Sequence, residues 1–332
     1  MSKNSKKQQK TIILYWNYRK KGFDYVWWIY RDAIEKKRTK IVCPPFFLQS
    51  EFCIEWYMQH AHSKSLLKNI WYVFFLFGIG SARKNNYVFL INDQCPYLCD
   101  LQFLDLLKRK YNAKLVLTIR NMIKNKERPM LGLISAKDAE KYFDLIVTDE
   151  LEDSKLYGYP YFPDTFTNMY KKEIKVKYDL CFCGADKKRL KLVKEIYKLA
   201  EAKGIKTDFR IVEDNKKNIK GIKYVEWQPY PEVVKQDLQS NCILEILQPG
   251  QTGFTLRTQE AICCNKKLLT NNKEIVNNKY YNPKYMQIFE RIEDIDFEFI
   301  KKRENVDYHY ENDFSSINFL REILCKLRRN TK

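Results

Sequence analysis

Glycine, proline and histidine are scarce in this chain. Its 332 residues contain only 10 Gly, 10 Pro and 3 His. So few Gly and Pro residues argue against a disordered chain and against repeats built on glycine turns. His60, His62 and His309 have no acidic ligand beside them, and Cys95 and Cys99 lack a second pair at zinc-finger spacing. We therefore expect no bound metal and no cofactor.

The sequence also lacks the signatures of export and of a membrane span. The N-terminus is polar and basic, without the apolar stretch of a signal peptide. The apolar run Ile70–Gly80 is too short for a bilayer, which needs about 20 such residues. Several of the ten cysteines lie inside apolar runs, which is typical of reduced thiols. These features predict a cytoplasmic protein.

What the chain has in excess is positive charge and aromatic side chains. The formal net charge is +19, and 15% of the residues are aromatic. An excess of this size favours an anionic partner, which could be nucleic acid, an acidic membrane or a phosphorylated ligand. A solvated surface that happens to be rich in lysine is the alternative interpretation.

The order of apolar strands and amphipathic helices predicts an α/β fold. Strand and helix patterns alternate in both halves, which is typical of two doubly wound, Rossmann-like domains that face a cleft. We place the first domain at residues 1–165, a linker at 166–177 and the second domain at 178–300. A C-terminal amphipathic helix within 301–332 is expected to pack back across the domains.

Residues 65–84 allow two interpretations. The apolar run in their centre could form a buried helix of the first domain. It could also form an aromatic surface helix that dips into an anionic membrane, because lysine and arginine flank it on both sides.

The stretch Leu244–Ala261 has the pattern of an anion site. A buried strand containing one acid, Glu245, runs into a turn with Gly250 and Gly253, and a short helix follows. Free N–H groups and the helix dipole at such a place attract anions. An ordinary loop between a strand and a helix would give the same local pattern.

Four segments of the second half carry a family resemblance. They are Leu180–Arg189, Tyr230–Glu232, Ile243–Ala261 and Lys267–Ile275. Together they resemble the donor-binding domain of GT-B glycosyltransferases, most of all the CgeB-like enzymes of bacterial polysaccharide and lipopolysaccharide biosynthesis. The resemblance covers roughly residues 178–290, and the first half fits by architecture only.

The resemblance implies a binding site for the diphosphate of a nucleotide-sugar donor. It assigns Gly184, Lys187 and Arg189 to the loop that faces the diphosphate. It assigns the glycine turn and the helix after it to the same group, through Gly250, Gln251, Thr252, Gly253 and Arg257. Glu260 occupies the place where many such enzymes grip the donor ribose, since a carboxylate accepts two hydrogen bonds.

One position departs from the retaining GT-B pattern. Many of those enzymes carry a second Glu eight positions before the ribose-binding one, and here that position is Thr252. An inverting route needs a general base on the first domain. Asp93, after a strand, is the leading candidate, although it could simply cap a turn; Asp149 and Glu150 are weaker ones.

The acceptor side is expected at the strand ends of the first domain. Asn17, Arg120 and Asn121 follow predicted strands there. The sequence thus predicts a metal-independent glycosyltransferase that acts on a glycan or lipid-linked acceptor at the inner face of the cell membrane. The alternatives are a non-catalytic nucleotide or sugar binder on the same scaffold and a basic nucleic-acid-binding protein. No nucleic-acid-binding motif is present, so we expect no nucleic-acid partner.

Overall fold

The chain divides into two units of parallel α/β structure. The computed structural model describes residues 10–14, 26–36, 39–43, 48, 50–60, 68–79, 87–93, 95, 100–120, 122–123, 136–167, 170, 173–212 and 220–329. The first unit comprises residues 1–23, 31–162 and 320–332, and the second comprises 24–30 and 163–319. The division between residues 162 and 163 falls close to the boundary proposed at residue 165.

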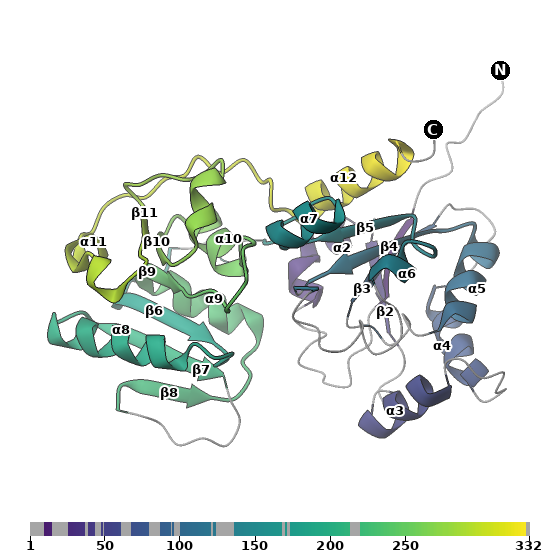
Figure 1. Ribbon diagram of the computed structural model, residues 1–332, viewed down its shortest axis with the longest axis horizontal. Coiled ribbons are helices and arrows are strands. Elements are labelled where there is room, and N and C mark those ends of the chain that lie inside the picture. The colour runs from purple at the N-terminus through teal and green to yellow at the C-terminus, as the bar shows by residue number, and fades with distance from the viewer. Residues whose placement is uncertain are drawn as a thin grey trace. The chain divides into compact units, whose positions relative to one another are not determined.

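The first unit is built on a five-stranded parallel sheet with the order β2-β1-β3-β4-β5. This order is one of the doubly wound arrangements, in which ligands bind beyond the carboxyl ends of the strands. The strands are β1 Lys10–Leu14, β2 Thr39–Val42, β3 Tyr87–Asn92, β4 Lys114–Ile119 and β5 Leu145–Thr148 (Figure 1). The helices are α2 Arg31–Glu35, α3 Glu51–His60, α4 Asn69–Ile79, α5 Leu101–Tyr111, α6 Ala136–Ala139 and α7 Leu151–Tyr157.

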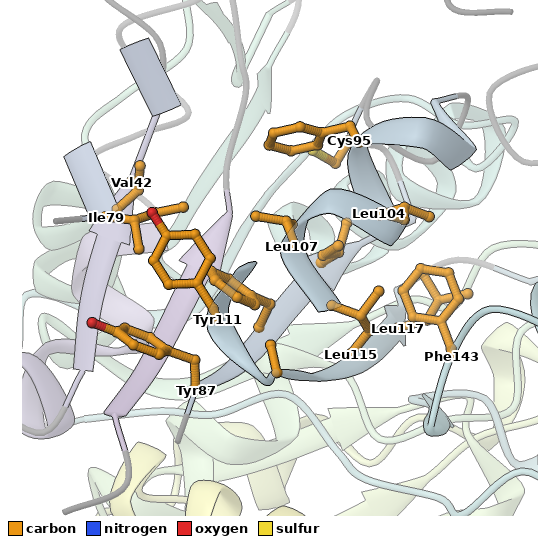
Figure 2. Packing of buried hydrophobic residues seen from close by; sticks show 14 of the residues in the cluster. Val42, Ile79, Tyr87, Cys95, Leu104, Leu107, Tyr111, Leu115, Leu117 and Phe143 are labelled. Carbon is orange, nitrogen blue, oxygen red and sulfur yellow. The ribbon is translucent and has the colours of Figure 1, made fainter. Parts of the chain in front are cut away.

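Helix α5 closes the core of this unit. Its Leu104, Leu107 and Tyr111 are buried against residues of the central strands, as Figure 2 shows. The rings of Tyr87 and Tyr111 meet edge to face with centroids 5.0 Å apart. Successive residues of β3 and β4 point to opposite faces of the sheet, and nearly all of them are buried. This is usual in a parallel sheet that helices cover on both faces.

The second unit is built on a six-stranded parallel sheet with the order β11-β10-β9-β6-β7-β8. The strands are β6 Tyr178–Gly184, β7 Thr207–Val212, β8 Ile222–Val225, β9 Ser240–Glu245, β10 Lys267–Thr270 and β11 Met286–Ile288. The helices are α8 Leu190–Ala202, α9 Tyr230–Leu238, α10 Leu256–Cys263 and α11 Phe297–Lys301 (Figure 1). Because β6 and β9 are central neighbours, the segments that follow them meet at one edge of the sheet.

Helix α12, Ser316–Arg329, ends the described chain. Its first residues belong to the second unit, and its residues from Leu320 onward belong to the first. In the first unit the Lys326 ammonium lies 5.8 Å from the centroid of the Phe162 ring.

Helix α4 presents two different faces. Trp71, Tyr72 and Ile79 are buried in the core of the first unit, whereas Val73 and Phe77 are exposed. The helix therefore combines a core face, as one interpretation of residues 65–84 expected, with an apolar surface. None of the helices in the described part of the chain has the length and apolar composition needed to cross a bilayer.

Candidate functional site

A lysine turn follows β6 at the carboxyl edge of the second sheet. The Arg189 N–H donates to the Asp186 carbonyl at 2.9 Å, which closes a four-residue turn. Both central residues are left-handed, Lys187 at φ 43° and Lys188 at φ 66°. This is a type I′ turn, which normally takes Gly, Asn or Asp at its centre. Helix α8 begins directly after this turn, at Leu190.

Arg189 spans the ends of the two central strands. Its Nε donates to the Ala185 carbonyl at 3.0 Å and its Nη1 to the Ile246 carbonyl at 2.5 Å. The guanidinium lies over the Phe182 ring, 5.3 Å from the centroid. A Cβ on Gly184 would stand 2.6 Å from Arg189 Nη2, so the glycine makes room for this arginine.

These three cations form no salt bridge with any of the described residues. The hydrogen bonds of Arg189 go to neutral carbonyls, and within the described ranges no carboxylate forms an ion pair with Lys187, Lys188 or Arg189. The charges of Glu245 and Asp186 act on Arg189 without a salt bridge. The Lys187 and Lys188 side chains are exposed. Among the described residues, the two lysines therefore present their positive charge to solvent at this edge.

The glycine turn after β9 lies at the same edge. The Gln251 N–H donates to the Gln248 carbonyl at 3.0 Å, and Gly250 at φ 84° occupies the third position of the turn. Pro249 before it fits a type II turn, which requires a positive φ at that third position. Gln251 and Thr252 are half-buried, and Gly253 is buried.

Two asparagines after β10 hold this loop in place. The Asn272 side chain donates to the Gly253 carbonyl at 3.1 Å. The Asn271 side chain accepts from the Leu247 N–H at 2.8 Å. The loop is thus held at both ends by side chains that directly follow β10.

Glu245, the acid inside β9, is a structural clamp. Its carboxylate accepts hydrogen bonds from the hydroxyls of Thr255 at 2.6 Å, Thr258 at 2.9 Å and Thr270 at 2.5 Å. Burial raises the pKa of Glu245 above its ordinary value, and the three hydroxyl donors oppose this rise only in part. Thr255 also caps α10, since its hydroxyl accepts from the Arg257 N–H at 3.1 Å. The clamp joins β9, β10 and the start of α10.

Arg257 lies between two buried carboxylates. Its Nη1 donates to Asp237 Oδ2 at 2.9 Å and also forms an ion pair with Glu260. Its Nη2 donates to the Cys183 carbonyl at 2.8 Å, at the end of β6. Glu260 is completely buried and accepts from the Tyr230 hydroxyl at 2.8 Å. These contacts fix α9 and α10 to β6, and the donor contacts expected of Arg257 and Glu260 stay predictions.

Asp237 was not recognised in the sequence as part of this network. It belongs to α9, 20 positions before Arg257, and it is buried. Its signal is helical spacing, because Tyr230, Val234 and Asp237 recur on the buried face of one helix. An acid at a buried position of an amphipathic helix indicates a buried cationic partner.

Arg189 brings a positive charge to this edge, whereas the charge of Arg257 is paired with Asp237 and Glu260. Burial, followed by the positive charge of Arg257, lowers the pKa of Arg189 to about 10. Arg189 still carries its charge at neutral pH, and like charges held this close favour a bound anion. Burial raises the pKa of Glu260 to about 8, against the opposing effect of Arg257. A neutral Glu260 would leave still more positive charge uncompensated.

The carboxyl edge of the first sheet carries the other predicted residues. Asp93 follows β3 and is 2% exposed, and its N–H donates to the Thr118 carbonyl at 3.0 Å. Arg120 is half-buried after β4, Asp149 is half-buried after β5, and Glu150 is buried at the start of α7. Asn17 and Asn121 lie outside the described residues. The catalytic role of Asp93 stays a prediction.

The described ranges hold no group of three or more His, Cys, Asp or Glu side chains that could bind a metal ion. The cations at the edge of the second sheet are instead arginine and lysine side chains.

Comparisons with known proteins identify the fold. No family model matches the chain, and no curated protein is detectably similar in sequence. Among solved structures, an α-glucosyltransferase in complex with UDP and a 13-mer DNA has a TM-score of 0.61 at 9% identity, over 96% of this chain and 99% of that chain. An α-glucosyltransferase in complex with UDP has a TM-score of 0.56 at 9% identity, over 96% and 99% of the two chains. The DNA-modifying enzyme β-glucosyltransferase has a TM-score of 0.49 at 11% identity, over 97% of each chain.

The two α-glucosyltransferases are GT-B glycosyltransferases, and the chain shares their type of fold. The prediction of an α/β chain with two Rossmann-like domains is confirmed by its two parallel sheets.

Proposed function

We propose that this protein is a glycosyltransferase that moves a sugar from a nucleotide-sugar donor to an acceptor. One observation carries the proposal. In the second unit of a GT-B fold, Lys187, Lys188 and Arg189 stand at the carboxyl edge of the sheet, and no carboxylate among the described residues forms an ion pair with them. A nucleoside diphosphate supplies the negative charge that this edge lacks.

The donor diphosphate is placed between the lysine turn and the glycine turn. Lys187 and Arg189 would neutralise it from the β6 side, and the loop of Gly250, Gln251, Thr252 and Gly253 would border it from the β9 side. UDP is the first nucleotide to test, because the α-glucosyltransferases with this fold were seen with UDP.

Arg257 and Glu260 support the same site from the interior of the second unit. Arg257 holds the end of β6, and Glu260 and Asp237 fix Arg257 in place. The ribose contact that the GT-B resemblance implies for Glu260 requires that this buried carboxylate become accessible when the donor binds.

The chemistry assigned to these side chains needs no metal. Arginine and lysine can stabilise the leaving diphosphate electrostatically, as metal ions do in other transferases. Turnover is therefore expected to be unchanged by EDTA, and a loss of activity restored by Mg²⁺ or Mn²⁺ would contradict this part of the proposal.

With Thr252 in place of a second Glu, we propose an inverting reaction. A base in the first unit would deprotonate the acceptor hydroxyl, which then attacks the anomeric carbon while the nucleoside diphosphate leaves. Asp93 is the proposed base, because it follows β3 at the carboxyl edge of the first sheet.

For the acceptor we propose a polysaccharide or lipopolysaccharide precursor in the cytoplasm, at the inner face of the cell membrane. The support is the CgeB-like pattern of residues 178–290. DNA is a second candidate, although the sequence contains no nucleic-acid-binding motif. It is favoured by the net charge of +19 and by the α-glucosyltransferase of this fold that was seen with DNA.

Two measurements, made one after the other, test the proposal. A thermal-shift screen against nucleotides and nucleotide sugars identifies the donor, since a ligand that binds the native state raises the melting temperature. Release of the nucleoside diphosphate is then measured with a lipid-linked glycan fraction and with duplex DNA as acceptors. Acceptor-dependent release supports a transferase and shows which acceptor is used. Donor binding with no release on any acceptor would instead identify a non-catalytic nucleotide-sugar binder.

A further inference from the structure

The first unit has an apolar surface that its own core does not use. Four large side chains of α3 and α4 are exposed: Phe52 at 75%, Ile70 at 45%, Val73 at 63% and Phe77 at 88%. We call these four residues the α3–α4 patch. Ile70, Val73 and Phe77 follow one another at spacings of three and four residues, so they lie along one side of α4.

The opposite sides of α3 and α4 pack against the core of the first unit. On the opposite side of α4, Trp71 is buried and stacks on Trp56 of α3 with ring centroids 5.0 Å apart. Tyr57 of α3 is fully buried, and its hydroxyl donates to Asp100 at 2.9 Å. The two helices are thus fixed to the core by one face while the other face carries the exposed apolar side chains. Three exposed apolar side chains along one side of α4 mark an interaction surface.

The charges point to an anionic lipid surface as the occupant. Helix α4 contains no charged residue, and exposed Lys40 donates to the Gly78 carbonyl in its last turn. The whole chain carries a net charge of +19, so two copies repel each other. Nucleic acid would supply anions but few contacts for Val73 and Phe77. The surface of an anionic bilayer offers both apolar and negative groups.

We propose that the α3–α4 patch docks this protein on the surface of anionic membranes. Helix α4 has 11 residues and is about 16 Å long, so it would lie in the interface and not cross the bilayer. Phe52 and Phe77 would enter the acyl boundary, and Lys40 would remain among the headgroups. Glu55, exposed on α3 three residues after Phe52, opposes binding to anionic lipid.

Vesicle co-sedimentation with the full chain tests this inference without any donor or acceptor. The wild type is expected to sediment with vesicles of phosphatidylcholine and phosphatidylglycerol, and much less with phosphatidylcholine alone. In the double variant Val73→Ser/Phe77→Ser, the ratio of vesicle-bound to free protein should fall at least about tenfold. Glu55→Gln should bind anionic vesicles more tightly.

Leu156→Ser is the matched control, because Leu156 is 63% exposed on α7 of the same unit. It should bind vesicles like the wild type, and thermal melts should show that all variants are folded. Equal vesicle binding by the double variant and the wild type would overturn the inference, as would no vesicle binding at all. A concentration-dependent dimer of the wild type that the double variant loses would assign the patch to a second copy instead. Because nucleotide binding is not measured, failure here leaves the proposed transferase function standing.

Discussion

Replacing Lys187 by glycine should make the protein more stable and a weaker nucleotide binder at the same time. Lys187 is left-handed at φ 43°, a conformation that costs an ordinary residue about 1–2 kcal/mol. Glycine adopts it without that cost, but it loses about 0.4–1 kcal/mol through the greater freedom of the unfolded chain. The expected net gain is about 1 kcal/mol, or roughly 2–4 °C in Tm for a domain of this size.

The same substitution removes one of the cations proposed to face the donor diphosphate. Since the Lys187 side chain is exposed, we expect the loss to be about 1 kcal/mol, or about fivefold in Kd. The assay is a melt in the absence of ligand followed by calorimetric titration with UDP. A higher Tm together with weaker UDP binding would show that the strained conformation of the turn serves nucleotide binding. A higher Tm with unchanged UDP binding would show that it does not.

His309→Gly is the matched control for this experiment. His309 is exposed and also left-handed, at φ 49°, but it lies in a loop of the second unit away from the turn. Its replacement should raise Tm by a similar mechanism and leave UDP binding unchanged. If Lys187→Gly were less stable than the wild type, the assigned turn geometry would be wrong. If it bound UDP as tightly as the wild type, Lys187 would have no part in the site.

Three further predictions concern buried or catalytic groups. Arg257→Ala should cost about 3–5 kcal/mol of unfolding free energy in chemical denaturation, because it leaves Asp237 and Glu260 buried without their shared cation. Burial raises the pKa of Glu260 from the ordinary value of 4.5 to about 8 in the folded protein. The folded state therefore favours the protonated form of Glu260. This contribution to stability is complete below pH 4.5 and is lost as the pH rises to 8. The stability of the wild type relative to Glu260→Gln should therefore fall across that range, by at most about 1.4 kcal/mol per pH unit, and a difference independent of pH would contradict the assignment. Asp93→Asn should lower kcat by about 10²–10⁴ with an unchanged Kd for UDP, and a variant with normal kcat would exclude Asp93 as the base.

Most of the strands could be predicted from the sequence because they are short, continuous apolar runs. Lys114–Ile119 and Lys267–Thr270 are two such runs, and both form strands in the structure. Helix α3 was missed because its ten residues lack a clear apolar period, with aromatic and polar side chains mixed around the helix. Strand β11 has only three residues and gains its structure by pairing with β10.

The candidate site was predictable in outline and not in its contacts. The spacing of Arg257 and Glu260 placed both on one helix face, and the structure joins them in an ion pair. Their burial depends on Asp237 and Tyr230 from α9, a tertiary contact that local pattern does not contain. The position of Arg189 over Gly184 likewise follows from the lysine turn, whose left-handed residues contradict the ordinary preference of lysine.

The most direct test of the proposed donor site is calorimetric titration of nucleoside diphosphates into the wild type and Arg189→Gln. Glutamine can still donate to one of the two carbonyls that Arg189 holds, but it removes the charge. Lys198→Gln, on the exposed surface of α8, is the control for an equal change in net charge. We predict that the wild type and Lys198→Gln bind UDP alike and that Arg189→Gln binds it at least about tenfold more weakly. Equal UDP affinity in all three proteins, or no binding of UDP, GDP or ADP by the wild type, would contradict the proposal that this edge holds a nucleotide-sugar donor.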